Sequence, residues 1–133
     1  MKLVIDTNVL VASLIRDSFV RKFLVGGRHI FYLPEQALEE IEEHIQEISR
    51  KANTDEKKVY VLLGVIVSDM ELVPKSRLLA KMGEALEIMG EIDADDAPVA
   101  ACALAVGADA IVTYDKDFKR QKKILVFTPD EVK

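Results

Sequence analysis

Four carboxylates that are far apart in the sequence, Asp6, Glu40, Asp96 and Asp115, could together hold a divalent metal ion. Carboxylates packed side by side repel one another and raise one another's pKa, so such a group is stabilised mainly by a cation. With a single cysteine and two histidines, the chain offers oxygen ligands, which favour Mg²⁺ or Mn²⁺ over zinc. Such an ion bridges phosphate oxygens and activates water, so these residue types predict hydrolysis of a phosphodiester bond.

Each of these acids also has a plain structural interpretation. An aspartate directly after a strand, as Asp6 is expected to be, often only forms a turn or caps a helix. Glu40 belongs to an acidic stretch that could simply be a solvated helix face. Asp96 stands beside Asp93 and Asp95, and spacing alone does not choose among the three. Only the combination of the four acids therefore points to a metal site.

The elements that must position these acids are short apolar strands alternating with amphipathic helices. This alternation predicts a parallel sheet with helices on both faces, an α/β/α arrangement. We expect strands at residues 2–6, 29–33, 71–73, 110–113 and 124–127, and helices at 9–15, 18–27, 35–50, 53–67, 78–89 and 95–107, with a capping box at Asn53 and Glu56 and with Pro34 stopping the second strand.

In such a sheet, ligands bind at the carboxyl ends of the strands. Asp6 ends the first expected strand and Asp115 lies just beyond the fourth, so both should lie at this edge. Glu40 lies about a turn and a half into the helix that follows the second strand, near the same edge. Asp96 opens the helix that leads into the fourth strand, so its placement depends on the preceding loop. The four acids can therefore converge.

The composition sets the broad class of the chain. A length of 133 residues suits one domain, and we expect a single domain over residues 1–133. With 50% hydrophobic and 31% charged residues, the chain is not of a disordered type. No apolar run approaches the roughly 20 residues that span a bilayer, and no signal peptide is recognisable, so we expect a cytoplasmic protein without membrane contact. The net charge of −5 argues against general attraction to nucleic acid.

Four segments closely resemble the motifs of PIN-domain proteins, and they occur in the same order. They are Asp6-Thr7-Asn8-Val9-Leu10, Leu38-Glu39-Glu40-Ile41, Asp96-Ala97-Pro98-Val99-Ala100-Ala101 and Val112-Thr113-Tyr114-Asp115-Lys116-Asp117-Phe118. The resemblance implies a three-layer fold with strand order 3-2-1-4-5. It also implies a metal-dependent nuclease site that most often acts on RNA. In that strand order, Asp6 and Asp115 would flank the point at which the chain reverses direction, in agreement with the strand-end argument.

The same resemblance assigns roles to individual residues. Asp6, Glu40, Asp96 and Asp115 match the acidic positions of the family. Asp117 and Asp93 match positions where some members add a carboxylate. Thr7, Asn8 and Thr113 match positions that could orient water or a ligand.

Positive charge is concentrated directly after Asp115. The residues concerned are Lys116, Lys119, Arg120, Lys122 and Lys123, and Arg16, Arg21 and Lys22 after the first helix could extend the patch. These side chains could contact RNA phosphates beside the metal. A solvated connection between two strands is an equally good interpretation.

The leading hypothesis is an Mg²⁺- or Mn²⁺-dependent endoribonuclease. The length and the single domain resemble VapC-type toxins of toxin-antitoxin pairs, which implies an antitoxin partner and a homodimer. The second hypothesis is a non-catalytic RNA- or protein-binding module in which the acids serve as caps. A haloacid dehalogenase-type phosphatase fits less well, because Asn8 occupies the place of its second aspartate.

Overall fold

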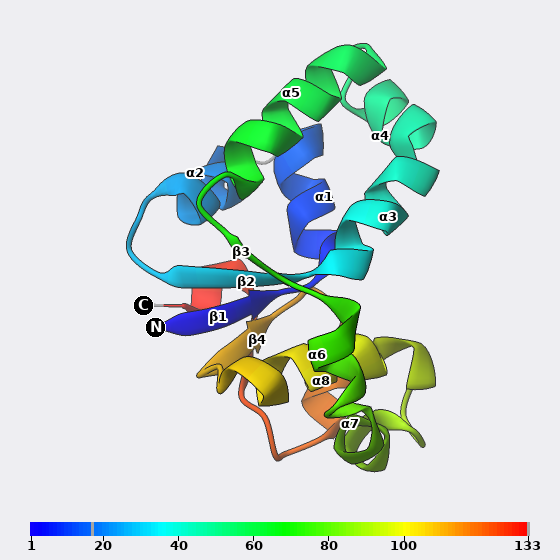
Figure 1. The fold of residues 1–133 in the computed structure, drawn as a ribbon. Coiled ribbons are helices and arrows are strands. Elements are labelled where there is room, and N and C mark those ends of the chain that lie inside the picture. The colour runs from blue at the N-terminus through cyan, green and yellow to red at the C-terminus, as the bar shows by residue number, and fades with distance from the viewer. Residues whose placement is uncertain (17, 133) are drawn as a thin grey trace.

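The computed structural model of the protein describes residues 1–16 and 18–132. Its centre is a five-stranded parallel sheet in the order β3-β2-β1-β4-β5 (Figure 1), which confirms the expected topology. The strands are β1 (Lys2–Ile5), β2 (Ile30–Pro34), β3 (Glu71–Val73), β4 (Ala110–Val112) and β5 (Val126–Phe127).

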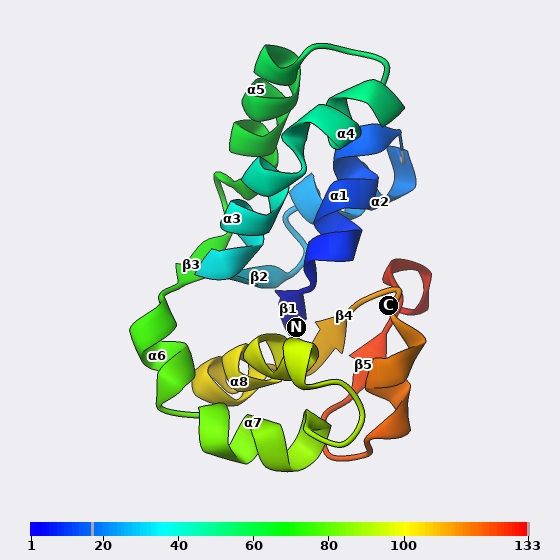
Figure 2. The same cartoon turned by 90° about the vertical axis from the view of Figure 1, so that its right-hand side faces the viewer.

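Helices cover both faces of the sheet, as the alternating pattern predicted. Figure 2 shows α1–α5 on one side and α6–α8 on the other. The α-helices are α1 (Thr7–Ile15), α2 (Ser18–Val25), α3 (Glu35–Glu43), α4 (Ile45–Lys51), α5 (Glu56–Val67), α6 (Lys75–Leu79), α7 (Met82–Met89) and α8 (Ala97–Val106), and the short 3₁₀ helices are η1 (Ala94–Asp96), η2 (Lys116–Arg120) and η3 (Pro129–Glu131).

The strands bury side chains on both faces, which explains why they read as continuous apolar runs rather than as alternating ones. In β1, Leu3 and Ile5 belong to the core under α1–α5, whereas Val4 belongs to the core under α6–α8. The second core is filled largely by the small residues of α8, including Ala97, Ala100, Ala101 and Ala103. Small side chains let α8 pack closely on the sheet. Because α8 leads back into the parallel strand β4, its first turn lies at the carboxyl edge.

Local capping explains how the chain leaves this edge. The Asp6 carboxylate accepts the N–H of Thr7 and caps α1 directly after β1. Pro98 lies in the first turn of α8, where its missing donor has no helical partner to lose, so it is compatible with the helix start. At the other end of α8, Gly107 adopts a left-handed conformation with φ of 65° and closes the helix.

Two expected helices are each divided in two. The helix expected at 35–50 breaks at His44, and the one expected at 78–89 is replaced by α6 and α7 with Ala80 and Lys81 between them. The reason is visible at the first break: the buried stripe of Ile41, Ile45 and Ile48 continues across it, while His44 is exposed. The spacing of apolar residues therefore continues as if the helix were unbroken, and it does not indicate a break at an exposed residue such as His44.

Three boundaries also differ from expectation. The capping box at Asn53 and Glu56 is wrong: Asp55 caps α5 by accepting the N–H of Lys58, and Asn53 forms the preceding turn with φ of 56°. Pro34 is the last residue of β2 rather than the residue that stops it. The last strand is only Val126–Phe127, because Gln121 binds the connection before it through the backbone of Ile124.

In the part of the chain that the structure describes, no helix is both long and apolar enough to cross a membrane.

Candidate metal centre

The carboxyl edge of the sheet contains a pocket of about 360 Å³ between the two helical layers. Asp6 follows β1 into this pocket, Glu40 reaches it from α3, and Asp96 borders it just before α8. Asp115, after β4, does not line the pocket but lies against Asp96 from the other side. The four predicted acids therefore come from four segments to this edge: Asp115 lies against Asp96, and Asp6 is close enough to act on Asp96. Glu40 is close enough to act on Asp6.

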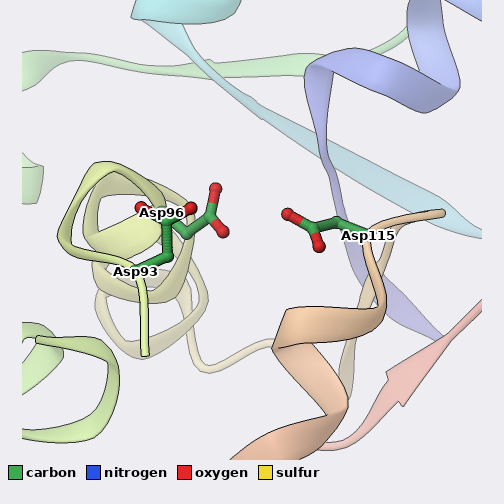
Figure 3. Close-up of side chains that lie close together, drawn as sticks. All are labelled: Asp93, Asp96 and Asp115. Carbon is green, nitrogen blue, oxygen red and sulfur yellow. The ribbon is translucent and has the colours of Figure 1, made fainter. Parts of the chain in front are cut away.

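Asp96 forms a close group with Asp93 and Asp115. One carboxylate oxygen from each lies within 4.8 Å of the other two, and Figure 3 shows the side chain of Asp115 directed toward Asp96. Opposite oxygen ligands of Mg²⁺ are about 4.2 Å apart, so small side-chain movements would bring all three onto one ion. Asp93 is held in place because its carboxylate accepts the N–H of Asp95 at 3.0 Å.

Asp6 is the most buried of the four acids, with 9% of its surface exposed. Its Oδ1 accepts the Thr7 N–H at 2.8 Å, and its Oδ2 accepts the Thr113 hydroxyl at 2.8 Å and the Asn8 amide at 3.2 Å. Burial raises the pKa of Asp6, the bonds from Thr113 and Thr7 oppose this shift, and Glu40 and Asp115 add to it. The carboxylate is therefore fixed in position and surrounded by negative charge.

Thr113 connects Asp6 to the segment that carries Asp115. Its hydroxyl donates to Asp6 and accepts both the Asn8 amide at 3.1 Å and the Asp115 backbone N–H at 3.0 Å. The Asn8 carbonyl in turn accepts the N–H of Tyr114 at 3.1 Å. Thr113 and Asn8 thus orient two of the acids, and Thr7 lines the pocket.

We expect Thr113→Val to lower the free energy of unfolding by about 1–3 kcal/mol. The isosteric valine removes the hydroxyl, so that Asp6, Asn8 and the Asp115 N–H each lose their hydrogen bond to it. Urea denaturation of the metal-free protein measures the change. Thr54→Val is the matched control, since the Thr54 hydroxyl makes no hydrogen bond with the described residues. Equal unfolding midpoints for the wild type and Thr113→Val would contradict this reading of the contact.

Asp96 carries the clearest electrostatic signal of the site. Its pKa is raised to about 7, first by loss of hydration and then by the adjacent carboxyl of Asp115 and the charges of Asp93 and Asp6. Its Oδ2 is buried and has no hydrogen-bond partner among the described residues. A buried carboxylate oxygen is normally bound to a hydrogen-bond donor or a cation, and the metal-free protein offers this one neither among the described residues. The site residues therefore fit a hard divalent ion with oxygen ligands.

The remaining predicted acids lie at the margin. Glu40 is exposed on α3 but close enough to raise the pKa of Asp6. Asp117 does not belong to the close group of three: its backbone N–H donates to Asp115 at 2.9 Å, and its carboxylate lies 3.9 Å from Arg120. Its role as a metal ligand stays a prediction.

Of the predicted RNA-contacting side chains, those on η2 directly follow Asp115, whereas Arg16 lies at the far end of α1, beside Ala52 and Lys58. Lys116, Lys119 and Arg120 are exposed on η2, and Arg16 is exposed after α1. Lys119 pairs with Glu131 at 2.9 Å and Arg120 lies near Asp117, so part of this positive charge is neutralised locally. Lys116 has no ion pair among the described residues.

One residue that lines the pocket was missed. Gln36 lies in the first turn of α3, and its Oε1 is the other buried side-chain atom without a partner among the described residues. The sequence does contain a signal for it. Gln36 is four residues before Glu40, so both residues lie on one face of the helix that leaves the carboxyl edge.

Comparison with solved structures finds several similar chains, two of which are as follows. One is from the crystal structure of VapBC2 from Rickettsia felis bound to a DNA fragment from their promoter, with a TM-score of 0.72, 18% identity and coverage of 96% of this chain and 98% of that one. The other is from the crystal structure of FitAcB from Neisseria gonorrhoeae, with a TM-score of 0.63, 20% identity and coverage of 98% and 99%. At these identities the likeness shows the fold alone.

Comparison with curated proteins gave no match. The family model described as "PIN domain" matches residues 4–123, which include every acid of the candidate site. The chain therefore belongs to the PIN-domain family.

Proposed function

We propose that this protein is a metal-dependent endoribonuclease that hydrolyses phosphodiester bonds of RNA. The observation that supports this most is Asp96, a carboxylate with a pKa of about 7 and an unpartnered oxygen, placed among three other acids. Such a cluster destabilises the metal-free fold, and its natural counterpart is a cation that also binds phosphate. Membership of the PIN-domain family supports a nuclease. The resemblance to PIN-domain motifs implies RNA as the most frequent substrate.

In this proposal, Asp6, Glu40, Asp96 and Asp115 hold Mg²⁺ or Mn²⁺, with Asp93 beside them. When bound there, the ion would supply Lewis-acid chemistry that activates water and offsets negative charge at phosphorus. Thr113 and Asn8 keep the Asp6 and Asp115 segments in fixed relative positions, so these ligands need no ordering when RNA binds. Asp96 releases its proton when the ion binds. Asp117 positions the Asp115 side chain through its backbone N–H.

The RNA would be held by cations next to the acids. Helix η2 begins immediately after Asp115, so Lys116, Lys119 and Arg120 follow the metal ligand within a few residues. The predicted contact at Arg16 lies at the far end of α1, beside Ala52 and Lys58, and is not part of this surface. Phosphate contacts of this kind position a nucleic acid without reading its sequence. Because the protein is acidic overall, the local cations and the bound metal would carry most of the attraction.

We further propose that the protein acts as the toxin of a toxin-antitoxin pair and forms a homodimer in the cytoplasm. The similar chain from VapBC2 matches this chain over nearly its full length, so the two have the same domain content in the matched region. Mass measurement in solution tests the homodimer. A small reading frame beside the gene of this protein, encoding a candidate antitoxin, would support the toxin-antitoxin pair. A protein that stays monomeric would remove the homodimer.

The direct test is incubation of purified protein with RNA and Mn²⁺ or Mg²⁺, with and without excess chelator. We expect cleavage that depends on the metal and stops in chelator, because the acids alone cannot activate water while they repel one another. Denaturing gels of an end-labelled RNA measure internal cuts. Cleavage that persists unchanged in chelator, or no cleavage and no effect of metal on stability, would exclude a metal-dependent nuclease and leave the binding module.

A further inference from the structure

Among the described residues, the two that carry an unpartnered buried side-chain atom line one pocket. The atoms are Oδ2 of Asp96 and Oε1 of Gln36, and both residues line the cavity of about 360 Å³ at the carboxyl edge. A buried polar atom without a partner costs stability, so native proteins contain few of them. Two such atoms on residues that line one pocket indicate that the partner of each arrives with a ligand.

The pocket itself offers Gln36 no suitable donor. Its acidic lining residues are Asp6, Glu40, Asp95 and Asp96, and once they are ionised, as metal binding requires, their carboxylates only accept hydrogen bonds. The hydroxyl of Thr7 is the other side-chain donor in the lining besides the Gln36 amide, and no hydrogen bond joins Thr7 to Gln36. The remaining lining side chains, those of Ile5, Pro34, Ala37, Pro98 and Val99, are apolar. With the acids ionised, no side chain that lines the pocket offers Oε1 a donor, which favours a donor that arrives with a ligand.

The place of Gln36 specifies which donor fits. Gln36 is one helical turn from Glu40 on the same face of α3, with Asp96 on the opposite wall of the pocket. A small ion such as Mg²⁺ keeps several waters when it binds carboxylates. Those waters are strong donors, and side chains behind the ligands typically accept from them.

We propose that Gln36 is a positioning residue, whose Oε1 accepts a hydrogen bond from a water in the hydration shell of the ion that Asp6, Glu40, Asp96 and Asp115 would hold. This inference rests on the metal site of the proposed function, and it assigns Gln36 a role in metal affinity rather than in folding.

The test measures Mn²⁺ binding by isothermal titration and by the paramagnetic resonance of free Mn²⁺, together with thermal unfolding of the metal-free protein. For Gln36→Met, a substitution of similar length without the amide oxygen, we expect Mn²⁺ affinity to fall about tenfold. The metal-free unfolding temperature should stay equal or rise, because a buried unpartnered acceptor is removed. A purely structural glutamine would give the opposite pattern, with lower stability and unchanged affinity.

Two further variants make the result specific. Gln46→Met, at an exposed position of α4, should leave both readings unchanged. Gln36→Glu keeps an acceptor at the same place and should bind Mn²⁺ at least as tightly as the wild type. If Gln36→Glu binds as weakly as Gln36→Met, the amide acts as a donor and the proposal is overturned. If Gln36→Met binds Mn²⁺ as tightly as the wild type, the proposal is overturned as well, whether or not the binding of RNA changes.

Failure of the proposed function has a different signature. In that case the wild type itself binds no Mn²⁺ or Mg²⁺, and neither Asp96→Asn nor Gln36→Met changes any metal-dependent reading. A wild type that binds Mn²⁺ and loses it on Asp96→Asn, but not on Gln36→Met, keeps the metal site and removes only the role of Gln36.

Discussion

Asp6→Asn should lower the rate of RNA cleavage by about 10²–10³-fold, the size of effect seen when one fixed electrostatic element of an active site is removed. Asparagine keeps the shape of the side chain but supplies no negative charge to the metal. Asp6 is also the acid whose position is fixed most firmly, by Thr7, Asn8 and Thr113. The loss should therefore reflect charge rather than disorder. Initial rates of cleavage of an end-labelled RNA at saturating Mn²⁺ measure it.

Interpretation of this variant requires that the fold survives. The asparagine amide cannot accept all three donors that meet the carboxylate, but it removes a buried charge whose pKa is raised by burial. We expect a cooperative unfolding transition close to that of the wild type. Asp69→Asn, at an exposed position after α5, is the matched control and should cleave normally. Equal cleavage by Asp6→Asn and the wild type would sink the proposed mechanism.

The sequence predicted the position of an acidic residue correctly where that residue directly follows an expected strand. Asp6 and Asp115 were expected at the carboxyl edge because they follow the strands 2–6 and 110–113, and the structure places them there. The hydrogen bonds of Thr113 show why the two segments stay in register: one hydroxyl joins the end of β1 to the end of β4. Whether these residues carry the activity stays a prediction.

The sequence did not predict the direction of a side chain where that direction depends on the geometry of a turn. Spacing could not choose among Asp93, Asp95 and Asp96, and the structure separates them: Asp95 is exposed, whereas Asp93 and Asp96 face Asp115. The 3₁₀ turn η1 sets this difference, and a pattern of residue types does not encode its rotation. Gln36 was missed for a related reason, since an uncharged residue in a first helical turn has no distinctive chemistry until its unpartnered oxygen is seen.

Asp96→Asn should stabilise the metal-free protein, and the size of the gain should depend on pH. The pKa of Asp96 is about 7 in the folded state against an ordinary value of 3.8. Below about pH 4 the group is neutral in both states, and its cost is absent. As pH rises toward 7 the unfolded chain ionises first, so the folded state loses stability. The asparagine variant escapes this loss.

The measurement is the unfolding midpoint in urea for both proteins between pH 4 and pH 8, with chelator present. We expect equal midpoints near pH 4, a difference that grows up to about pH 7 in favour of Asp96→Asn, and a constant difference above it. Asp130→Asn, an exposed aspartate in η3, is the control and should show no such trend. A variant less stable than the wild type at pH 8 would mean that the Asp96 carboxylate has an unrecognised partner.

Addition of Mn²⁺ should reverse the order of the two proteins. The ion binds the folded wild type and stabilises it by about 2.7 kcal/mol at a concentration one hundred times the Kd, whereas Asp96→Asn lacks the charge that holds it. Because the ion must displace the proton of Asp96, wild-type affinity should fall by up to about tenfold for each pH unit below 7. The same Asp96 carboxylate would then lower the stability of the metal-free protein and be a principal ligand of the ion. If Mn²⁺ leaves Asp96→Asn the more stable protein at pH 8, Asp96 does not bind the metal.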